Sequence, residues 1–138
     1  MTGHPRPALN GLPTLLVEDD PAGARLLSGL LADAGCEVRV AASAEDAYIA
    51  LRSFEPRLVV LDLVLPRMGG LMLARQLTGA ARHAGLVIVA VSVMDAEVAG
   101  QLALQAGCTA FVGKPIDPLT FADTIAHHVA RAGAPGQP

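Results

Sequence analysis

The chain has 138 residues, of which 52% are hydrophobic and 17% charged, and its formal net charge is −3. This length supports one sizeable core and is too short for two ordinary domains, so we expect one globular domain, and the composition excludes a disordered chain. The longest apolar runs, 58–61 and 86–91, fall far below the roughly 18 to 20 residues that cross a bilayer, which excludes membrane insertion. The net negative charge argues against direct binding of nucleic acid.

The two ends of the chain are rich in Pro and Gly and show no sustained apolar period. We therefore expect a flexible N-terminal extension over 1–13, a folded domain over 14–131 and a flexible C-terminal tail over 132–138. The first twenty residues contain three prolines and three acids, and no apolar stretch suited to a signal peptide. A cytoplasmic location is the resulting expectation.

Five short runs rich in Leu and β-branched residues alternate with longer segments rich in Ala and Leu. The runs are 14–17, 37–40, 58–63, 86–92 and 110–112. They begin 21 to 28 residues apart, which leaves room for a helical crossover and is too long for a hairpin. The near-continuous apolar runs at 58–63 and 86–91 predict strands covered on both faces, as in the centre of a parallel sheet.

The segments between these runs carry the signals of helix starts and ends. Pro21 follows Asp20 at a first-turn position, Gly35 stands just past the end of the same segment, 43–46 forms a capping box, and Asp117-Pro118 opens the last helix. We also expect helices over 71–83 and 96–106. The predicted inner faces are Leu26, Leu27, Leu30 and Leu31 in the first helix, Ala47, Ala50, Leu51 and Phe54 in the second, and Ala122, Ile125 and Val129 in the last.

This alternation predicts an α/β fold: a (βα)5 doubly wound, parallel, five-stranded sheet with helices on both faces. Such sheets bind ligands at the carboxyl ends of their strands, in the crevice where the strand order reverses. The residues that follow each strand are therefore the first place to look for a functional site.

Polar residues close four of the five predicted strands. They are Glu18-Asp19-Asp20 after the first, Asp62 in the third, Ser92 at the end of the fourth and Lys114 after the fifth. Asp62 lies inside an apolar run, where a carboxylate is costly unless it has partners. Clustered carboxylates disfavour each other's ionisation, so they predict a hard divalent cation, Mg²⁺ or Mn²⁺. A structural Asp at a strand end and an acidic helix N-terminus are the alternative interpretations.

Lys114 is the only lysine of the chain, beside nine arginines. Near Asp62 and a metal, its point charge can hold an anionic oxygen that is absent in the resting state. These parts fit transfer of a phosphoryl group to a carboxylate. Asp62 would be the nucleophile, the metal and Lys114 would neutralise phosphoryl oxygens, and the Ser92 hydroxyl would donate a hydrogen bond.

With these residues, the chain resembles the response-regulator receiver domains of two-component signalling, over essentially all of 14–131. The matching motifs are Leu15-Leu16-Val17-Glu18-Asp19-Asp20, Leu58–Leu65 running into Pro66-Arg67-Met68-Gly69-Gly70, Val89-Ala90-Val91-Ser92, and Phe111-Val112-Gly113-Lys114-Pro115. The separations of 30 residues from Asp62 to Ser92 and 22 from Ser92 to Lys114 suit the family. The resemblance implies a flavodoxin-like sheet of strand order 2-1-3-4-5.

The resemblance also implies which residues accept the phosphoryl group and hold the metal. Asp62 is the expected phosphoacceptor. Asp19 is the expected direct metal ligand beside Asp62, while Glu18 acts through water and Val64 contributes its backbone carbonyl. Magnesium, or manganese in its place, is the implied cofactor.

A second group of residues is implied to bind the phosphoryl group and to switch. Ser92 and Phe111 form the expected switch pair, in which the hydroxyl moves toward the phosphoryl group and the ring turns inward to fill the vacated space. Lys114 is expected to bind the phosphoryl group. The Lys114-Pro115 peptide bond is expected to be cis, as it is in the family.

The implied function is that of a stand-alone receiver, because both flanks are too short for an output domain. It would take its phosphoryl group from a phosphohistidine, on a histidine kinase or a phosphotransfer protein. It would catalyse its own phosphorylation and dephosphorylation as a signalling module, not as a turnover enzyme. Its output would be a contact between a downstream protein and the face built from the fourth helix, the fifth strand and the fifth helix.

Three positions depart from the commonest pattern of the family. Val93 follows Ser92 where Ala or Gly is usual and narrows access to the site. Val64 and Met94 are apolar where polar side chains often orient water, so all three are expected to modulate the rates. Two alternatives remain open: a hydrolase acting through an aspartyl phosphate, which would carry a second Asp at position 64, and a degenerate receiver that serves only as a binding scaffold.

Cys36 and Cys108 show no CxxC motif and no Cys/His spacing typical of a metal site. We expect two buried thiols, with a disulfide as the alternative. The sequence assigns them no function.

Overall fold

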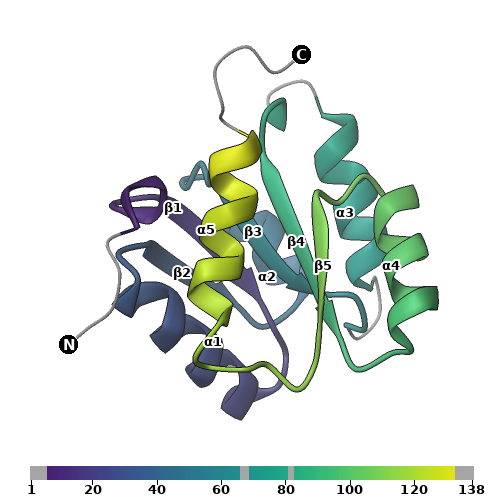
Figure 1. Cartoon of the computed structure of the whole chain (residues 1–138). Helices are drawn as coiled ribbons and strands as arrows, with labels where there is room; N and C mark the ends of the chain where they lie inside the picture. Colours follow the sequence, from purple (N-terminus) through teal and green to yellow (C-terminus); the bar gives the residue numbers. More distant parts are fainter. Residues whose placement is uncertain (1–5, 66–68, 81–82, 133–138) are drawn as a thin grey trace.

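The computed structural model describes residues 6–65, 69–80 and 83–132. The strands are β1 (Pro13–Val17), β2 (Glu37–Ala41), β3 (Leu58–Asp62), β4 (Val87–Ser92) and β5 (Ala110–Gly113). The helices are the short 3₁₀ helix η1 (Pro7–Leu9), α1 (Pro21–Asp33), α2 (Ala44–Ala50), α3 (Gly70–Gly79), α4 (Ala96–Gln105) and α5 (Phe121–Ala132). All strand pairs are parallel and the order is β2-β1-β3-β4-β5, which confirms the predicted fold (Figure 1).

Two layers of helices enclose this sheet. α1 and α5 cover one face, and α2, α3 and α4 cover the other (Figure 1). Every residue of β3 and of β4 is buried, as their unbroken apolar runs predict for central strands. Among the described residues, no helix is long and apolar enough to cross a membrane.

Side-chain caps account for where three helices begin. Asp20 Oδ2 accepts the Gly23 amide at 2.9 Å at the start of α1, and Ser43 Oγ accepts the Asp46 amide at 3.0 Å at the start of α2. Asp95 caps α4 in the same way. These side chains satisfy amide groups that have no partner within the first turn of a helix.

The last helix begins later than the Asp117-Pro118 signal predicts. Asp117 Oδ1 accepts the Leu119 amide at 2.9 Å and its carbonyl accepts the Phe121 amide at 3.0 Å, which closes a turn ahead of α5. In consequence Phe121, 2% exposed, joins Ile125 on the inner face of α5, while Val129 is partly buried.

The N-terminal segment differs from the flexible extension expected over 1–13. From Arg6 onward the chain is packed: η1 places Leu9 at 0% exposure, and the Gly11 amide donates to the Gly35 carbonyl at 2.8 Å. The physical reason is burial of Leu9 in the cluster between α1 and α5, which offsets the entropy of ordering a short segment. Residues 1–5, and 133–138 of the expected tail, lie outside the described part.

Cys36 and Cys108 are buried free thiols, as predicted. Burial raises the pKa of Cys108 from 9.0 to about 11. The unfolded chain therefore releases this proton at lower pH than the folded chain, and stability should fall as the pH rises from 9 toward 11. We expect a loss of about 2 kcal/mol from this thiol over that window. Urea unfolding of the parent and of Cys108→Ala between pH 8 and pH 11 checks this: the variant should show the shallower decline, and equal slopes would contradict the prediction.

Candidate functional site

The site lies at the edge of the sheet where the parallel strands end. β3 ends at Asp62 and β4 at Ser92, while Glu18 and Lys114 are the residues directly after β1 and β5. The chain runs from β1 to β2 on one side and reaches β3 on the other, so Glu18 and Asp62 flank the reversal of strand order. The fold therefore brings together, from four strand ends, the residues that the sequence singled out.

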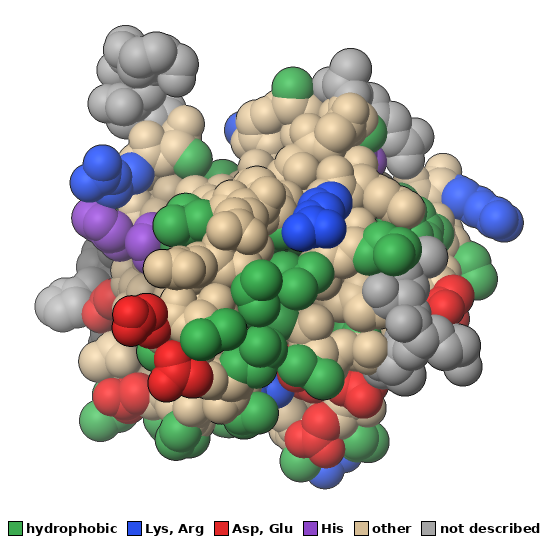
Figure 2. Space-filling model, turned by 90° about the vertical axis from the view of Figure 1, so that its right-hand side faces the viewer, with side chains coloured by type: hydrophobic (Ala, Val, Ile, Leu, Met, Phe, Trp, Pro, Cys, Tyr) green, Lys and Arg blue, Asp and Glu red, His purple; other side chains and the backbone are tan. Residues whose placement is uncertain are grey.

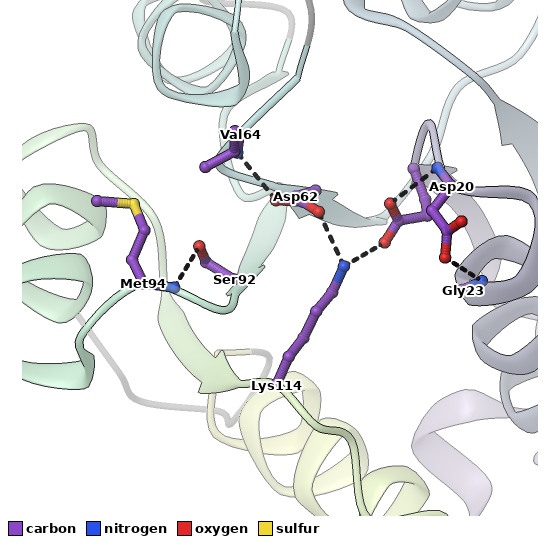
Figure 3. Close-up of polar contacts among 8 residues, drawn as sticks. Asp20, Gly23, Asp62, Val64, Ser92, Met94 and Lys114 are labelled. Carbon is purple, nitrogen blue, oxygen red and sulfur yellow. Dashed lines mark hydrogen bonds and ion pairs between the residues drawn. The ribbon is translucent and has the colours of Figure 1, made fainter.

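Lys114 joins the two acidic strand ends. Its Nζ donates to Glu18 Oε1 at 2.7 Å and to Asp62 Oδ2 at 2.8 Å (Figure 3). The side chains of Glu18, Asp62 and Lys114 are 0%, 11% and 18% exposed. Charged groups as buried as these are stable only when they are paired and hydrogen-bonded, and here each group has such a partner.

The ion pairs also decide the protonation of Lys114. Burial by itself lowers the pKa of its ammonium group, but the hydrogen bonds and charges of Asp62 and Glu18 outweigh that effect. The pKa therefore lies above its ordinary value of 10.5. At neutral pH Lys114 is a fixed positive charge beside Asp62.

Glu18, Asp19 and Asp62 offer carboxylate oxygens that lie within 4.8 Å of one another. Glu18 and Asp62 are buried, while Asp19 is exposed. Three carboxylates here face the single ammonium group of Lys114, so negative charge is in excess and a divalent cation with oxygen ligands fits the cluster. These three are the residues that could hold the predicted magnesium ion.

The loop after β3 fixes the orientation of the Asp62 carboxylate. The Val64 amide donates to Asp62 Oδ1 at 2.9 Å, and the Val64 side chain points away into solvent at 57% exposure (Figure 3). At the far end of the loop Gly70 lies so close to the Asp62 carbonyl that a Cβ atom at position 70 would overlap it. Gly69, the residue directly before α3, has φ of +79°, a conformation that favours glycine.

Ser92 and its neighbours form the opposite wall of the site. Ser92 is fully buried, and its Oγ accepts the Met94 amide at 3.1 Å. Val93 is 76% exposed, and Phe111 is partly buried against the core beneath α4. The structure thus places both members of the predicted switch pair on β4 and β5, beside the site. The Lys114-Pro115 bond is cis, as the resemblance implied.

Two contacts of the site were not predicted from the sequence. One is the pairing of Glu18 with Lys114, across 96 residues of chain. Glu18 was expected only as a metal ligand acting through water, yet its other carboxylate oxygen accepts the Asp20 amide at 3.2 Å. The other is the close approach of Gly70 to Asp62, for which the glycine pair at 69–70 is the one signal in the sequence.

The fold and the site define a class: doubly wound α/β domains with an acidic centre and a lysine at the switch point of the sheet. The chain belongs to the response regulator receiver domain family, whose model matches residues 14–126. Receiver domains are signalling modules of two-component systems, take phosphoryl groups from histidine kinases or phosphotransfer proteins, and bind Mg²⁺ through an acidic cluster.

Known proteins similar to the chain fall into two groups by length. The protein PilH of Pseudomonas aeruginosa is 29% identical over 111 residues, which cover 80% of this chain and 92% of PilH. The DNA-binding response regulator MtrA of Mycolicibacterium smegmatis is 35% identical over 104 residues, 75% of this chain but only 44% of MtrA. The chain therefore spans less than half of the longer relative.

Solved structures show the same fold. The chemotaxis response regulator CheY4 of Vibrio cholerae superposes with a TM-score of 0.80 over 86% of this chain and 99% of that protein. Its sequence identity of 22% makes this a likeness of fold.

Proposed function

We propose that this receiver accepts a phosphoryl group from a phosphohistidine onto Asp62, in a reaction that requires Mg²⁺. The observation that carries the proposal is the contact of Lys114 Nζ with Asp62 Oδ2 at 2.8 Å, inside a cluster of three carboxylates. A fixed cation beside a carboxylate nucleophile can take up the charge that arrives with a phosphoryl group.

In the proposed reaction a carboxylate oxygen of Asp62 attacks phosphorus, and the bond from phosphorus to the histidine nitrogen breaks. Lys114 then exchanges its contact with the carboxylate for one with a phosphoryl oxygen, and Ser92 donates its hydroxyl hydrogen to another. Glu18, Asp19, Asp62 and the backbone carbonyl of Val64 would hold the magnesium ion, which when bound supplies positive charge to the phosphoryl oxygens.

The alternative of a hydrolase acting through an aspartyl phosphate is less well supported. Such an enzyme needs a general acid or base near the nucleophile, and the residue two positions after Asp62 is the exposed, apolar Val64. Steady turnover of a phosphate ester by the parent protein would favour that alternative. A scaffold that is never phosphorylated would bind partners equally well with and without a phosphoryl donor.

The experiment that tests the proposal is incubation of the parent protein with phosphoramidate or acetyl phosphate, followed by measurement of its intact mass. With Mg²⁺ the protein should gain the mass of one phosphoryl group, and with EDTA it should not. A labelled fraction that is the same in EDTA would overturn the metal requirement. The absence of label with Mg²⁺ would overturn the proposal and favour the degenerate receiver that serves only as a binding scaffold.

We propose that the signal leaves through the face built from α4, β5 and α5. Figure 2 shows a band of hydrophobic side chains down the middle of this side of the molecule. Val98 and Leu104 of α4 are 51% and 68% exposed, and a groove of about 310 Å³ between α4 and β5 is lined in part by Leu104 and Phe111. Exposed apolar surface of this kind fits a protein partner in the cytoplasm, where we place this receiver.

Phosphorylation should remodel this face through Ser92 and Phe111. When Ser92 turns toward the phosphoryl group, it gives up its hydrogen bond to the Met94 amide and leaves space for the ring of Phe111. Amide hydrogen exchange should therefore change within residues 93–113 when beryllofluoride is added as a phosphoryl mimic. Residues 21–33 of α1 serve as the internal control, and equal protection of 93–113 in both states would count against the switch.

The phosphorylated form should be long-lived for a receiver. Hydrolysis requires a water placed in line with phosphorus, and such placement is worth several kcal/mol of barrier. The side chains of Val64 and Met94 offer no hydrogen bond to that water, and Val93 adds bulk beside its path. Val64→Asn and Met94→Glu should each speed the loss of phosphate, by about tenfold if one hydrogen bond to water is gained. Decay followed by intact mass checks this, with Val98→Asn as the control on α4; decay no faster than the parent's would show that other groups place the water.

A further inference from the structure

The segment ahead of β1 lies outside the part of the chain that the family model matches, yet it is held against α5. Leu9 is fully buried, in the cluster that also holds Phe121 and Ile125. Arg6 Nε donates to Asp123 Oδ1 at 2.9 Å, and the Arg6 side chain is 19% exposed. An apolar contact and an ion pair thus tie residues 6–12 to the first turns of α5.

The first turn of α5 ends the loop that begins at Lys114. At its start the loop is held by the Lys114 amide, which donates to the Ser92 carbonyl at 2.8 Å. Between its ends Leu119 is 86% exposed, while Ile116 packs against the cluster that also holds Leu9. At the far end of the loop, Phe121 is buried in the apolar cluster that also contains Leu9. The loop that carries Lys114 is therefore anchored on the same apolar cluster as residues 6–12.

We propose that residues 6–12 position the loop that carries Lys114, with Arg6 and Leu9 acting as positioning residues through α5. This inference rests on the proposed role of Lys114 in phosphoryl binding. Lys114 Nζ has to reach Glu18 and Asp62 at 2.7 and 2.8 Å at once, which leaves little room for displacement. Misplacement of a reacting group by about 1 Å can slow a reaction on the order of a hundredfold.

The experiment uses the fact that Lys114 is the only lysine in the chain. Protein labelled with ¹³C and ¹⁵N in lysine alone gives one lysine side-chain signal by NMR, so the surroundings of this ammonium group are read without a phosphoryl donor. In Leu9→Ala that signal should move or broaden, and labelling by phosphoramidate should slow by about tenfold. The matched control is Leu77→Ala, a buried leucine of α3 in the cluster on the other face of the sheet.

Leu77→Ala should lower stability as much as Leu9→Ala does and leave the lysine signal in place. A lysine signal and a labelling rate in Leu9→Ala that match Leu77→Ala would overturn the proposal, because residues 6–12 would then contribute stability alone.

A second set of variants keeps the test valid if Leu9→Ala does not fold. Arg6→Asp places two negative charges together at the exposed pair, and it should shift the lysine signal and slow labelling by about threefold. The double variant Arg6→Asp with Asp123→Arg restores an ion pair in the opposite sense and should restore both readouts. A single variant that behaves like the parent contradicts the inference. If the parent itself takes no phosphoryl group, the proposed function fails, while the NMR comparison still decides whether residues 6–12 place Lys114.

Discussion

Replacing Asp62 with Asn is expected to abolish transfer of a phosphoryl group to this receiver while leaving its fold in place. Asn keeps an oxygen for the Val64 amide at 2.9 Å, and Lys114 keeps Glu18 as a partner. What is lost is the anionic nucleophile and one of the three clustered carboxylates. The labelled fraction should fall at least a hundredfold, to the limit of detection by intact mass.

The matched control for this change is Asp20→Asn. Asp20 is a neighbouring acid of the same strand edge, but its carboxylate caps α1 at Gly23, a task that Asn performs equally well. This variant should label like the parent. Labelling of Asp62→Asn to the same extent as Asp20→Asn would show that another side chain accepts the phosphoryl group.

Removing the charge of Lys114 should have the second largest effect, and the effect should depend on metal. Lys114→Met keeps an unbranched side chain that is one atom shorter, and it leaves the buried Glu18 and Asp62 without their cation. Without Mg²⁺ the free energy of unfolding should fall by about 3 to 5 kcal/mol, because breaking a buried ion pair leaves charges uncompensated. With Mg²⁺ most of that loss should be regained, since the metal supplies positive charge to the same carboxylates.

The same variant should still be phosphorylated, at least tenfold more slowly than the parent, and yet fail to switch. The positive charge of Lys114 is needed once the phosphoryl anion has arrived, so beryllofluoride should no longer change the amide exchange of residues 93–113. Urea unfolding with and without Mg²⁺, combined with amide exchange, measures both effects, with Arg52→Met as the control for losing an exposed cation. A large loss of stability that Mg²⁺ does not restore, together with a normal response to beryllofluoride, would make Lys114 a structural residue only.

The sheet was predictable because each strand has a local signal. Buried central strands have to be apolar on both faces, so the runs at 58–63 and 86–91 identify β3 and β4 directly. The start of α5 was predicted too early, because the Asp117 side chain accepts the Leu119 amide in a turn that precedes the helix. Leu9 was missed for a different reason: the two leucines of the segment, Leu9 and Leu12, lie among prolines and are too few to show a periodicity. The burial of Leu9 depends on apolar surface that exists only once α1 and α5 have packed.

The part of the site that lies at strand ends could be predicted from the sequence. Asp62, Ser92 and Lys114 each follow or close a strand. Parallel strands end at the same edge of the sheet, so these residues can be placed together without knowing their side-chain conformations. The pairing of Glu18 with Lys114 needs that knowledge, because it depends on the length and direction of two side chains from opposite sides of the crevice. The close approach of Gly70 to Asp62 likewise depends on the path of a loop, which residue pattern alone does not determine.

The central claim is that Asp62 carries the phosphoryl group, and one measurement tests it most directly. An aspartyl phosphate is a mixed anhydride, so borohydride reduces it to homoserine and leaves free aspartate unchanged. After incubation with phosphoramidate and Mg²⁺, reduction and peptide mass spectrometry should find homoserine at position 62 and Asp unchanged at positions 19 and 20. Homoserine at either of those positions, or none in the labelled protein, would contradict the assignment.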